Sequence, residues 1–407
     1  MTAVQTEVDL AEFLADARAW LDEHSTRIER VDDTIDWGEG EFSTAVFHAL
    51  TFDEERELID RIRSWYRTKA EHGYHAVAWP TVYGGLGLPR KYARAFARLE
   101  AGYELPGGHE IISVTTRLIA STIDLLGTPD QKQRYVASFL RTEELCCQLF
   151  SEPGAGSDLA SLSCRAERDG DDWIINGQKV WSSAAQFSHF GELIARSDPS
   201  VPKHAGMTAF IVPLDLPGIE IRPIKQMSGG SSFNEVFFTD VRIPGSTRLG
   251  EIGQGWHVAL TTLGFERDHS DAQSSSAGHI GGSFRQLLAT ARGMGVTADP
   301  RIRQVLARAY THARLEQLVN RRVAAPGPEG SIGKLLWTDG MTAMSDAISL
   351  VLGARLVADT GEWGTYAWAE HVLGAPGYRI AGGSDEIQKN IIGERVLGLP
   401  REPRRQS

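Results

Sequence analysis

The chain has 407 residues, 42% hydrophobic and 23% charged, which is the composition of an ordinary globular protein and the length of two or three domains. The formal net charge of -11 argues against a nucleic-acid partner or an anionic membrane surface, since both call for a basic face. No apolar run approaches the roughly 20 residues needed to span a bilayer, so we expect no membrane insertion. Of the three cysteines, Cys146 and Cys147 are adjacent, which leaves no disulfide framework and no Cys-x-x-Cys motif. We therefore expect a cytoplasmic protein without a metal site.

The first third of the chain has the periodicity of helices. Apolar residues recur at i, i+3, i+4 and i+7, which predicts an amphipathic helix near the N-terminus and two more farther on. The stripes consist of Leu10, Phe13, Leu14, Ala17, Trp20 and Leu21, then Leu58, Ile59, Ile62 and Trp65, then Tyr92, Phe96 and Leu99.

From about Cys147 the pattern changes to short runs rich in β-branched and aromatic residues, separated by Gly, Pro, Asp and Asn. Such runs predict a small antiparallel β domain. The expected strands contain residues 173–175, 207–214, 219–224 and 235–243. After Trp256 helical periodicity returns, with long helices expected at residues 300–323 and 332–356. The order helices, strands, helices excludes a doubly wound βαβ domain and favours the α+β class.

Two segments more than two hundred residues apart are candidates for ligand contact: SEPGAGSD at residues 151–158 and GGSDEIQ at residues 382–388. Glycines such as Gly156 permit close approach of the backbone. Ser384 is expected to be a helix N-cap, and a helix N-terminus after two glycines suits an anionic group. Local sequence leaves two alternatives open: a glycine turn with Asp158 capping the next element, and a capped helix without a ligand.

Together with KVWSS at residues 179–183 and ERVLGLPR at residues 394–401, these segments closely resemble the flavin-dependent acyl-CoA dehydrogenases. The resemblance runs in order from about Trp79 to Arg401. It implies a helical domain, a β barrel and a C-terminal four-helix bundle. We place these domains at residues 1–146, 147–255 and 256–407.

The resemblance implies FAD as the cofactor. Phe150 and Ser151 would meet the flavin, and Ser157 would meet the pantetheine or phosphate of coenzyme A. Trp181 would cover one face of the isoalloxazine, for which a flat indole is suited, and Ser183 would place a hydroxyl near N5. Without the neighbouring motifs, Trp181 would be interpreted as a core tryptophan at a barrel rim.

In the second segment the candidate cofactor residues are Gly383, Ser384 and Glu386. The acidic residues Asp385 and Glu386 in the first turn would stabilise the helix, but they would repel a phosphate placed too near.

A catalytic base is expected because dehydrogenation of an acyl-CoA removes a proton from Cα. In the medium- and short-chain enzymes a glutamate precedes the last helix, and Gly382 stands at that position here. Isovaleryl-type enzymes and the actinobacterial steroid side-chain enzymes instead have a Glu-Arg pair on the first helix after the β domain, which matches Glu266 and Arg267. We assign Glu266 as base, with Leu263 and Phe265 desolvating it. The resemblance implies that Arg267 points toward coenzyme A or holds the helix. Asp268 and His269 are nearby alternatives for the base, but both are better interpreted as polar residues that end the helical turn. From composition alone the Glu-Arg pair would be two surface residues.

The chain departs from the family pattern at the bundle. Many family members have an Arg-x-x-Phe-Gly motif there, which reaches across a subunit boundary to the FAD of the neighbouring subunit. GGSFR at residues 281–285 keeps only the phenylalanine, and Arg285 is our candidate replacement for the lost cation. The implied assembly is a homodimer or homotetramer, with a heterotetramer as the alternative.

The function implied by the resemblance is FAD-dependent oxidation of an acyl-CoA to a trans-2-enoyl-CoA in fatty acid or steroid side-chain catabolism. Electrons would pass to an electron-transfer flavoprotein. Two other classes stay open: a flavin monooxygenase on the same fold, and a subunit of a heteromeric dehydrogenase.

Overall fold

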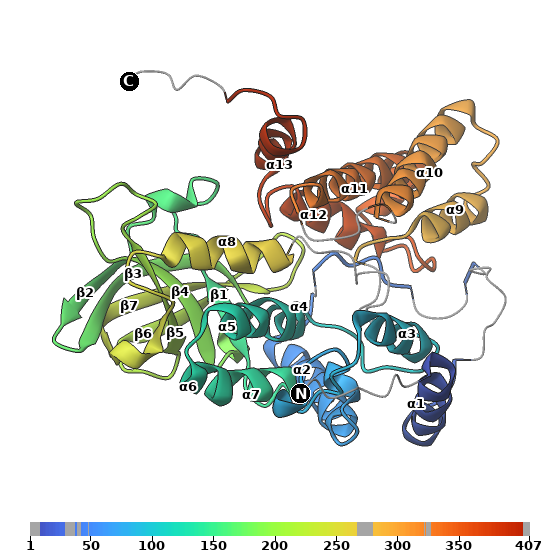
Figure 1. Ribbon diagram of the computed structural model, residues 1–407. Coiled ribbons are helices and arrows are strands. Elements are labelled where there is room, and N and C mark those ends of the chain that lie inside the picture. Colours follow the sequence, from blue (N-terminus) through green and yellow to red (C-terminus); the bar gives the residue numbers. More distant parts are fainter. Residues whose placement is uncertain are drawn as a thin grey trace, which may run out of the picture.

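The computed structural model describes residues 9–28, 37–38, 42–47, 49–266, 280–320, 322 and 327–401, without the side chains of Glu266 and Asn320. Helices precede and follow a single β region, so the expected α+β order is confirmed (Figure 1). No helix within the described ranges is long and apolar enough to cross a membrane.

The N-terminal part is helical, as the apolar stripes predict. A capping box fixes the start of α2: Thr51 accepts from the backbone N–H of Glu54, whose carboxylate accepts from the N–H of Thr51. The α-helices are α1 Leu10–His24, α2 Phe52–Ala70, α3 Arg90–Glu100, α4 Glu110–Ser113, α5 Ala120–Leu126, α6 Pro129–Gln131 and α7 Ala137–Leu140. A π-helical stretch, η3 (Val114–Ile119), joins α4 to α5.

The β region is one sheet of eight strands in the order β6-β7-β3-β2-β4-β5-β8, with β1 paired to β4. The strands are β1 Cys146–Leu149, β2 Arg165–Asp169, β3 Asp172–Ser183, β4 Phe190–Arg196, β5 Met207–Pro213, β6 Ile219–Ile224, β7 Phe233–Ile243 and β8 Arg248–Leu249. The prediction of antiparallel pairing was wrong for β1, which lies parallel to β4, and for the single β2–β4 pair.

Both faces of the sheet are buried at β1, β4 and β5, which explains the apolar runs of these strands, whereas β2, β6 and β7 contain exposed residues. The side chain of Cys146 lies in one core, beneath η3, α5 and α8 (Gly255–Glu266). The side chain of its neighbour Cys147 lies in a second core, beneath α2 and α4. Alternation along a strand places these two cysteines on opposite faces. Burial raises the pKa of the Cys147 thiol to about 12.

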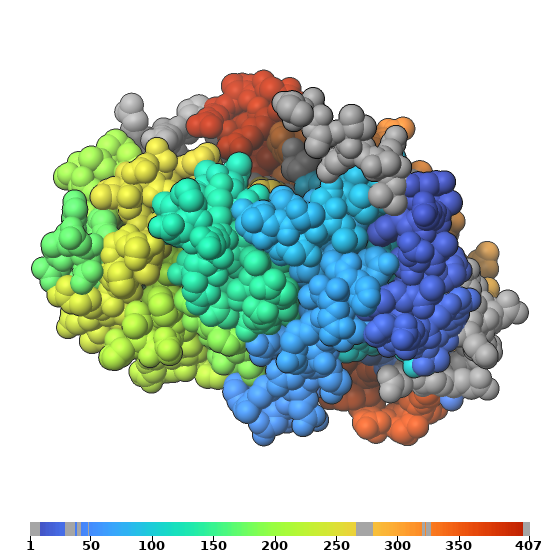
Figure 2. Space-filling view, turned by 60° about the horizontal axis from the view of Figure 1, so that its bottom comes forward, coloured from blue at the N-terminus to red at the C-terminus, as the bar shows by residue number. Residues whose placement is uncertain are grey.

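The C-terminal part is the helical bundle. Its helices are α9 Phe284–Gly293, α10 Pro300–Asn320, α11 Gly330–Leu352 and α12 Trp368–Tyr378, followed by α13 Asp385–Ile391 and the π-helical turn η10 Ile392–Val396. One core joins α9 to α12 around Trp368. Figure 2 shows the N-terminal helices, blue to teal, covering one side of the molecule next to the green and yellow β region.

Candidate active site

The loop at residues 150–156 is fastened to β3 by a buried ion pair. The Nζ atom of Lys179 lies 2.7 Å from Oε1 of Glu152 and donates to the Phe150 carbonyl at 3.0 Å. The N–H of Val180 donates to the Ser151 carbonyl at 2.9 Å. Desolvation opposes ionisation of Glu152, but Lys179 and the N–H groups of residues 163 and 164 outweigh it, so the pKa of this carboxyl is lowered. The structure therefore brings the first candidate segment against β3.

The glycines of this loop face open space. A Cβ atom added at Gly154 or Gly156 would meet no heavy atom within 4 Å, so packing of the chain itself does not require glycine there. Gly156 and Ser157 are exposed. Asp158 is the N-cap residue of the following turn, Leu159–Ser161, but its carboxylate accepts no backbone N–H there; it pairs with Lys203 and accepts from the Ser161 hydroxyl at 2.6 Å. An open glycine loop fits a ligand that approaches the backbone.

The side chain of Trp181 is exposed rather than buried. It is 59% exposed, and its φ of +61° coincides with a register shift of β3 against β7 between Lys179 and Ser182. A β-bulge of this kind re-aims side chains. The indole packs edge-on against Phe233, with the ring centroids 5.9 Å apart. The interpretation of Trp181 as a core tryptophan is therefore wrong, and its free face suits stacking on a planar ring.

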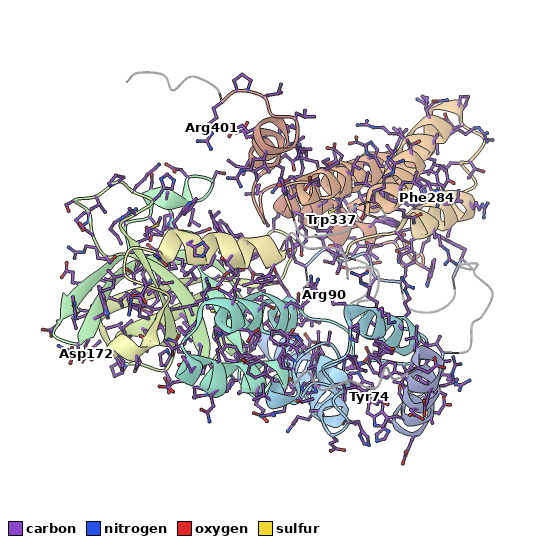
Figure 3. All side chains as sticks on the ribbon, viewed as in Figure 1. Tyr74, Arg90, Asp172, Phe284, Trp337 and Arg401 are labelled. Carbon is purple, nitrogen blue, oxygen red and sulfur yellow. The ribbon has the colours of Figure 1, made fainter. Side chains whose placement is uncertain are left out.

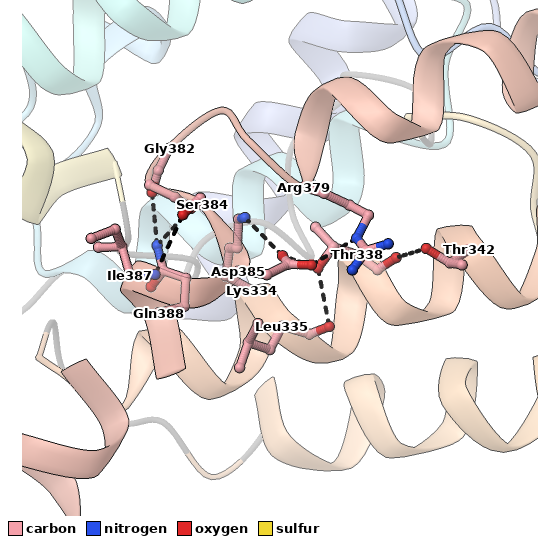
Figure 4. A network of polar contacts seen from close by, with 11 residues as sticks. Lys334, Leu335, Thr338, Thr342, Arg379, Gly382, Ser384, Asp385, Ile387 and Gln388 are labelled. Carbon is pink, nitrogen blue, oxygen red and sulfur yellow. Dashed lines mark hydrogen bonds and ion pairs between the residues drawn. The ribbon is translucent and has the colours of Figure 1, made fainter. Parts of the chain in front are cut away.

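The second candidate segment lies on the bundle. Gly382 and Gly383 have φ values of +66° and +90°, conformations that favour glycine. Ser384 is the N-cap of α13, as predicted, since its hydroxyl accepts from the N–H of Ile387 at 3.4 Å. The buried amide of Gln388 donates to the carbonyls of both glycines at 2.8 and 3.2 Å. These contacts hold the turn in a fixed shape (Figure 4).

Asp385 corrects one expectation about charge at this helix end. Its buried carboxylate turns inward, accepting from Arg379 at 2.7 Å and Thr338 at 3.0 Å, with Lys334 at 3.4 Å (Figure 4). Desolvation opposes ionisation, but these three groups outweigh it and lower the pKa of Asp385. Asp385 therefore ties α13 to α11 instead of repelling an anion at the turn, while Glu386 is exposed.

The proposed base lies at the end of α8. Glu266 is the last residue of this helix, and Leu263 and Phe265 before it are partly buried against the core beneath α5 and η3. Arg267, with Asp268 and His269, lies outside the described residues. The helix position of Glu266 agrees with the prediction, and its role as base stays a prediction.

The lost family arginine has a packing explanation. A Cβ atom at Gly281 would lie 2.8 Å from Nδ1 of His371, and one at Gly282 would lie 2.2 Å from the Trp368 ring. His371 Nδ1 also accepts from the N–H of Gly282 at 3.0 Å. Histidine and tryptophan thus occupy the space that side chains at residues 281 and 282 would need.

Arg285 is exposed in the first turn of α9. Sequence reasoning overlooked the cavity next to it, which has a volume of about 430 Å³ and lies between α9 and α10. Its lining includes Phe284 and the cations Arg292 and Arg303. Figure 3 shows Phe284 on the bundle, on the side away from the strands around Asp172. Periodicity could not reveal this cavity, because it depends on how two helices cross.

Two carboxyl groups near the sheet were also overlooked. Glu110, the first residue of α4, is exposed, and desolvation raises the pKa of its carboxyl against the opposing effects of His109 and the Ser183 hydroxyl. Glu192 of β4 is fully buried, and its Oε1 accepts from Thr262 of α8 at 2.7 Å. Burial raises the pKa of Glu192 to about 8, so this group is mostly protonated at neutral pH. A single glutamate within an apolar run carries no local signal of its burial.

Comparison with known sequences identifies the family. Profiles of the acyl-CoA dehydrogenase N-terminal, middle and C-terminal domains match residues 41–143, 147–241 and 253–397. The chain is 37% identical to "Acyl-CoA dehydrogenase IpdE1" of Mycobacterium tuberculosis, over 97% of this chain and 99% of that protein. It is 35% identical to FadE34 of the same organism, over 89% of this chain and 48% of that protein. The chain belongs to the acyl-CoA dehydrogenase family and is an oxidoreductase; members of this family are FAD-dependent flavoproteins.

Solved structures agree with this assignment. The "Tcur3481-Tcur3483 steroid ACAD" superposes with a TM-score of 0.72 at 25% identity, over 97% of this chain and 98% of that chain. The "ChsE4-ChsE5 complex from Mycobacterium tuberculosis" gives a TM-score of 0.69 at 24% identity, over 98% of this chain and 100% of that chain. The expected fold of helical domain, β domain and C-terminal bundle is confirmed.

Proposed function

We propose that this protein is an FAD-dependent dehydrogenase that converts an acyl-CoA thioester to the trans-2-enoyl-CoA. The observation that carries the proposal is the exposed indole of Trp181 beside an open glycine loop anchored by the Lys179–Glu152 pair. An exposed flat ring and free backbone groups fit the face and the edge of a flavin. The protein residues that would hold FAD are Phe150, Ser151, Gly156, Trp181, Ser183, Gly383, Ser384 and Glu386.

The bound flavin would supply the hydride acceptor. Glu266 would take the α proton, and the apolar side chains of Leu263 and Phe265 beside it would limit access of water. Ser157, exposed at the tip of its loop, and Arg267 would contact coenzyme A. Backbone N–H donors would stabilise the negative charge that develops on the thioester oxygen. Electrons would leave to an electron-transfer flavoprotein.

The acyl group would be bulky. Support comes from the solved steroid enzyme at 25% identity and from the base position at the end of α8, which resembles that of steroid side-chain enzymes. A flavin monooxygenase remains the alternative on this fold, and no observation on the described residues favours it.

The proposal is tested by anaerobic titration of the purified flavoprotein with a panel of acyl-CoAs that includes steroid side-chain thioesters. We expect at least one to bleach the flavin absorbance stoichiometrically. Denaturation should release FAD. Recovery of FMN, or a flavin that no acyl-CoA reduces but that consumes oxygen with another reductant, would contradict the dehydrogenase.

We further propose that the protein assembles through its bundle. Large apolar side chains are exposed there at Tyr310, Leu315 and Leu318 of α10 and Leu350 of α11. Such a surface favours a partner, either a second copy or a related subunit. Because α9 lies away from the sheet, Arg285 and the cavity beside it would serve the flavin of a neighbouring chain.

Light scattering with flavin quantitation separates the two assemblies. A homodimer or homotetramer with one FAD per chain, weakened by Arg285→Ala, supports the homomer. Fractional flavin that a co-expressed related subunit restores supports a heterotetramer, by analogy with the two different chains of the ChsE4-ChsE5 complex. A flavin-replete monomer would contradict both.

A further inference from the structure

The segment that carries Trp181 and Ser183 has a backbone conformation that side chains rarely adopt. Trp181 has a φ of +61°, and Ala184, directly after the end of β3, has a φ of +51°. This left-handed conformation is unfavourable for residues other than glycine, and it persists only where the surrounding structure enforces it. Two such residues in one short segment therefore indicate that contacts from outside the segment fix its shape.

The register of β3 against β7 shows what this shape does to Trp181. Lys179 lies opposite Val236 and Ser182 lies opposite Asn234, so between these pairs β3 contains one residue more than β7. All four side chains are buried, as expected for opposed residues that share one face of the sheet. Without the extra residue, Trp181 would lie opposite Asn234 and would point into the protein. The bulge is therefore what turns the indole outward.

Asn234 of β7 braces the bulge with its side chain. This side chain is fully buried, and its Nδ2 donates to the Ser182 carbonyl at 3.0 Å and to Oε1 of Gln186. Gln186 lies in the 3₁₀ turn η6 (Ala185–Phe187), and its own amide donates to the Ser231 carbonyl at 3.3 Å. One buried amide thus links the end of β3 to the turn that follows it.

We propose that Asn234 is a positioning residue that, together with Gln186, holds the bulge in the shape that presents Trp181 and Ser183 to the flavin. This inference rests on the proposed FAD-dependent function and adds to it a residue that acts through others. Asn234 acts through the backbone of Ser182, because its amide lies on the inward face. A side chain without an amide would leave the Ser182 carbonyl one donor short, and the left-handed residues on either side could then relax.

The test compares Asn234→Leu with Asn176→Leu. Asn176 is a matched control because it also bridges β3 and β7 at a register shift, which lies in the first half of β3. Its amide donates to the Asp240 carboxylate and accepts from the Asp240 N–H, both at 2.9 Å, and Asp240 has a φ of +49°. Both variants lose a cross-strand asparagine, but only Asn234→Leu loses the contact at the Trp181 bulge.

The first measurement does not require bound flavin. Hydrogen exchange of residues 181–187 is followed by mass spectrometry in the full-length protein as purified. We expect exchange to be faster by about 10-fold in Asn234→Leu, because a buried hydrogen bond is lost. Asn176→Leu should leave exchange of this segment as in wild type. Gln186→Leu should act in the same direction as Asn234→Leu, and it remains informative if Asn234→Leu does not fold.

The second measurement reports on the cofactor site. An indole stacked on a flavin quenches its fluorescence, so Asn234→Leu should raise the fluorescence of bound FAD. It should also weaken FAD binding by about 10-fold. Asn176→Leu should change neither quantity. In a Trp181→Leu background, Asn234→Leu should no longer change the fluorescence, because its effect on the flavin passes through Trp181.

Exchange of residues 181–187 that stays as in wild type in Asn234→Leu and Gln186→Leu would overturn the role of Asn234. A fluorescence change that persists in the Trp181→Leu background would overturn it as well. The proposed function fails on different results, namely that the protein holds no FAD or that no acyl-CoA reduces the flavin. Hydrogen exchange is measured whether or not flavin is bound or reduced, so the two failures are distinguishable.

Discussion

Lys179 and Glu152 form an ion pair of 2.7 Å in which the two side chains are 0% and 4% exposed. The pair joins the middle of β3 to the glycine loop at residues 151–158. Removal of one partner of a buried ion pair leaves the other charge without compensation, which is costlier than losing an exposed pair. The position of the loop therefore depends on a contact that no local sequence pattern predicts.

We expect Lys179→Met to lower the free energy of unfolding by roughly 3–5 kcal/mol and to weaken FAD retention, because Glu152 stays buried without its cation. Chemical denaturation and flavin content measure both effects. Lys203→Met is the matched control, since Lys203 pairs with Asp158 of the same loop at the exposed surface. Its expected effect is below about 1 kcal/mol. Equal losses in the two variants would show that burial of the pair is irrelevant.

Asp385→Ala should destabilise the bundle by about 3 kcal/mol, since Arg379, Thr338 and Lys334 all lose the carboxylate that joins them. If the turn at residues 382–384 contacts FAD, as proposed, flavin content should fall as well. Thermal unfolding and the absorbance spectrum measure the two effects. Glu386→Gln, at the exposed neighbouring position, should leave stability within about 0.5 kcal/mol. A stable Asp385→Ala protein would contradict the anchoring role.

Glu192 should make stability depend on pH. Its folded-state pKa, raised by burial to about 8, lies above the ordinary value of 4.5, so between these values the folded protein holds a proton that the unfolded chain releases. The contribution is complete below about pH 4.5 and is lost as pH rises toward 8. At about 1.4 kcal/mol per pKa unit, the loss is at most roughly 5 kcal/mol.

The measurement is the free energy of unfolding of wild type minus that of Glu192→Gln from pH 5 to pH 9. The amide cannot ionise but can still accept from Thr262, so we expect this difference to fall across the range and to level off above pH 8. A difference that stays constant would show that Glu192 is ionised in the folded protein at all of these pH values.

The order of elements and several local details could be predicted from the sequence because they depend on neighbouring residues. The N-cap at Ser384 and the strand through Trp173–Ile175 are of this kind. The strand β4 was overlooked because Glu192 interrupts an otherwise apolar run, and β1 because four residues carry little periodic signal. A local sequence pattern does not show which residues surround a side chain in the folded protein.

The same limit applies to the candidate site. The exposure of Trp181 follows from a bulge that depends on the register with β7. The inward turn of Asp385 depends on cations brought by α11 and by the end of α12. Such contacts are made by packing, so the sequence could supply candidates for the site but not the partners that set their charge and orientation.

Glu266→Gln tests the base. We expect flavin reduction by a good acyl-CoA to slow by about 10²- to 10⁴-fold while FAD and acyl-CoA still bind, because the amide keeps the shape of glutamate but cannot accept the α proton. Anaerobic stopped-flow absorbance gives the rate, and calorimetry gives the affinity. The control is Glu251→Gln, an exposed glutamate shortly before α8 that pairs with Arg248, which should leave the rate unchanged.

A second substitution, Gly382→Glu in the Glu266→Gln background, tests whether the other family position can supply the base. The φ of +66° at Gly382 makes a side chain there strained by roughly 1–2 kcal/mol, so only partial rescue is expected. A Glu266→Gln rate within a few-fold of wild type would show that another group removes the proton.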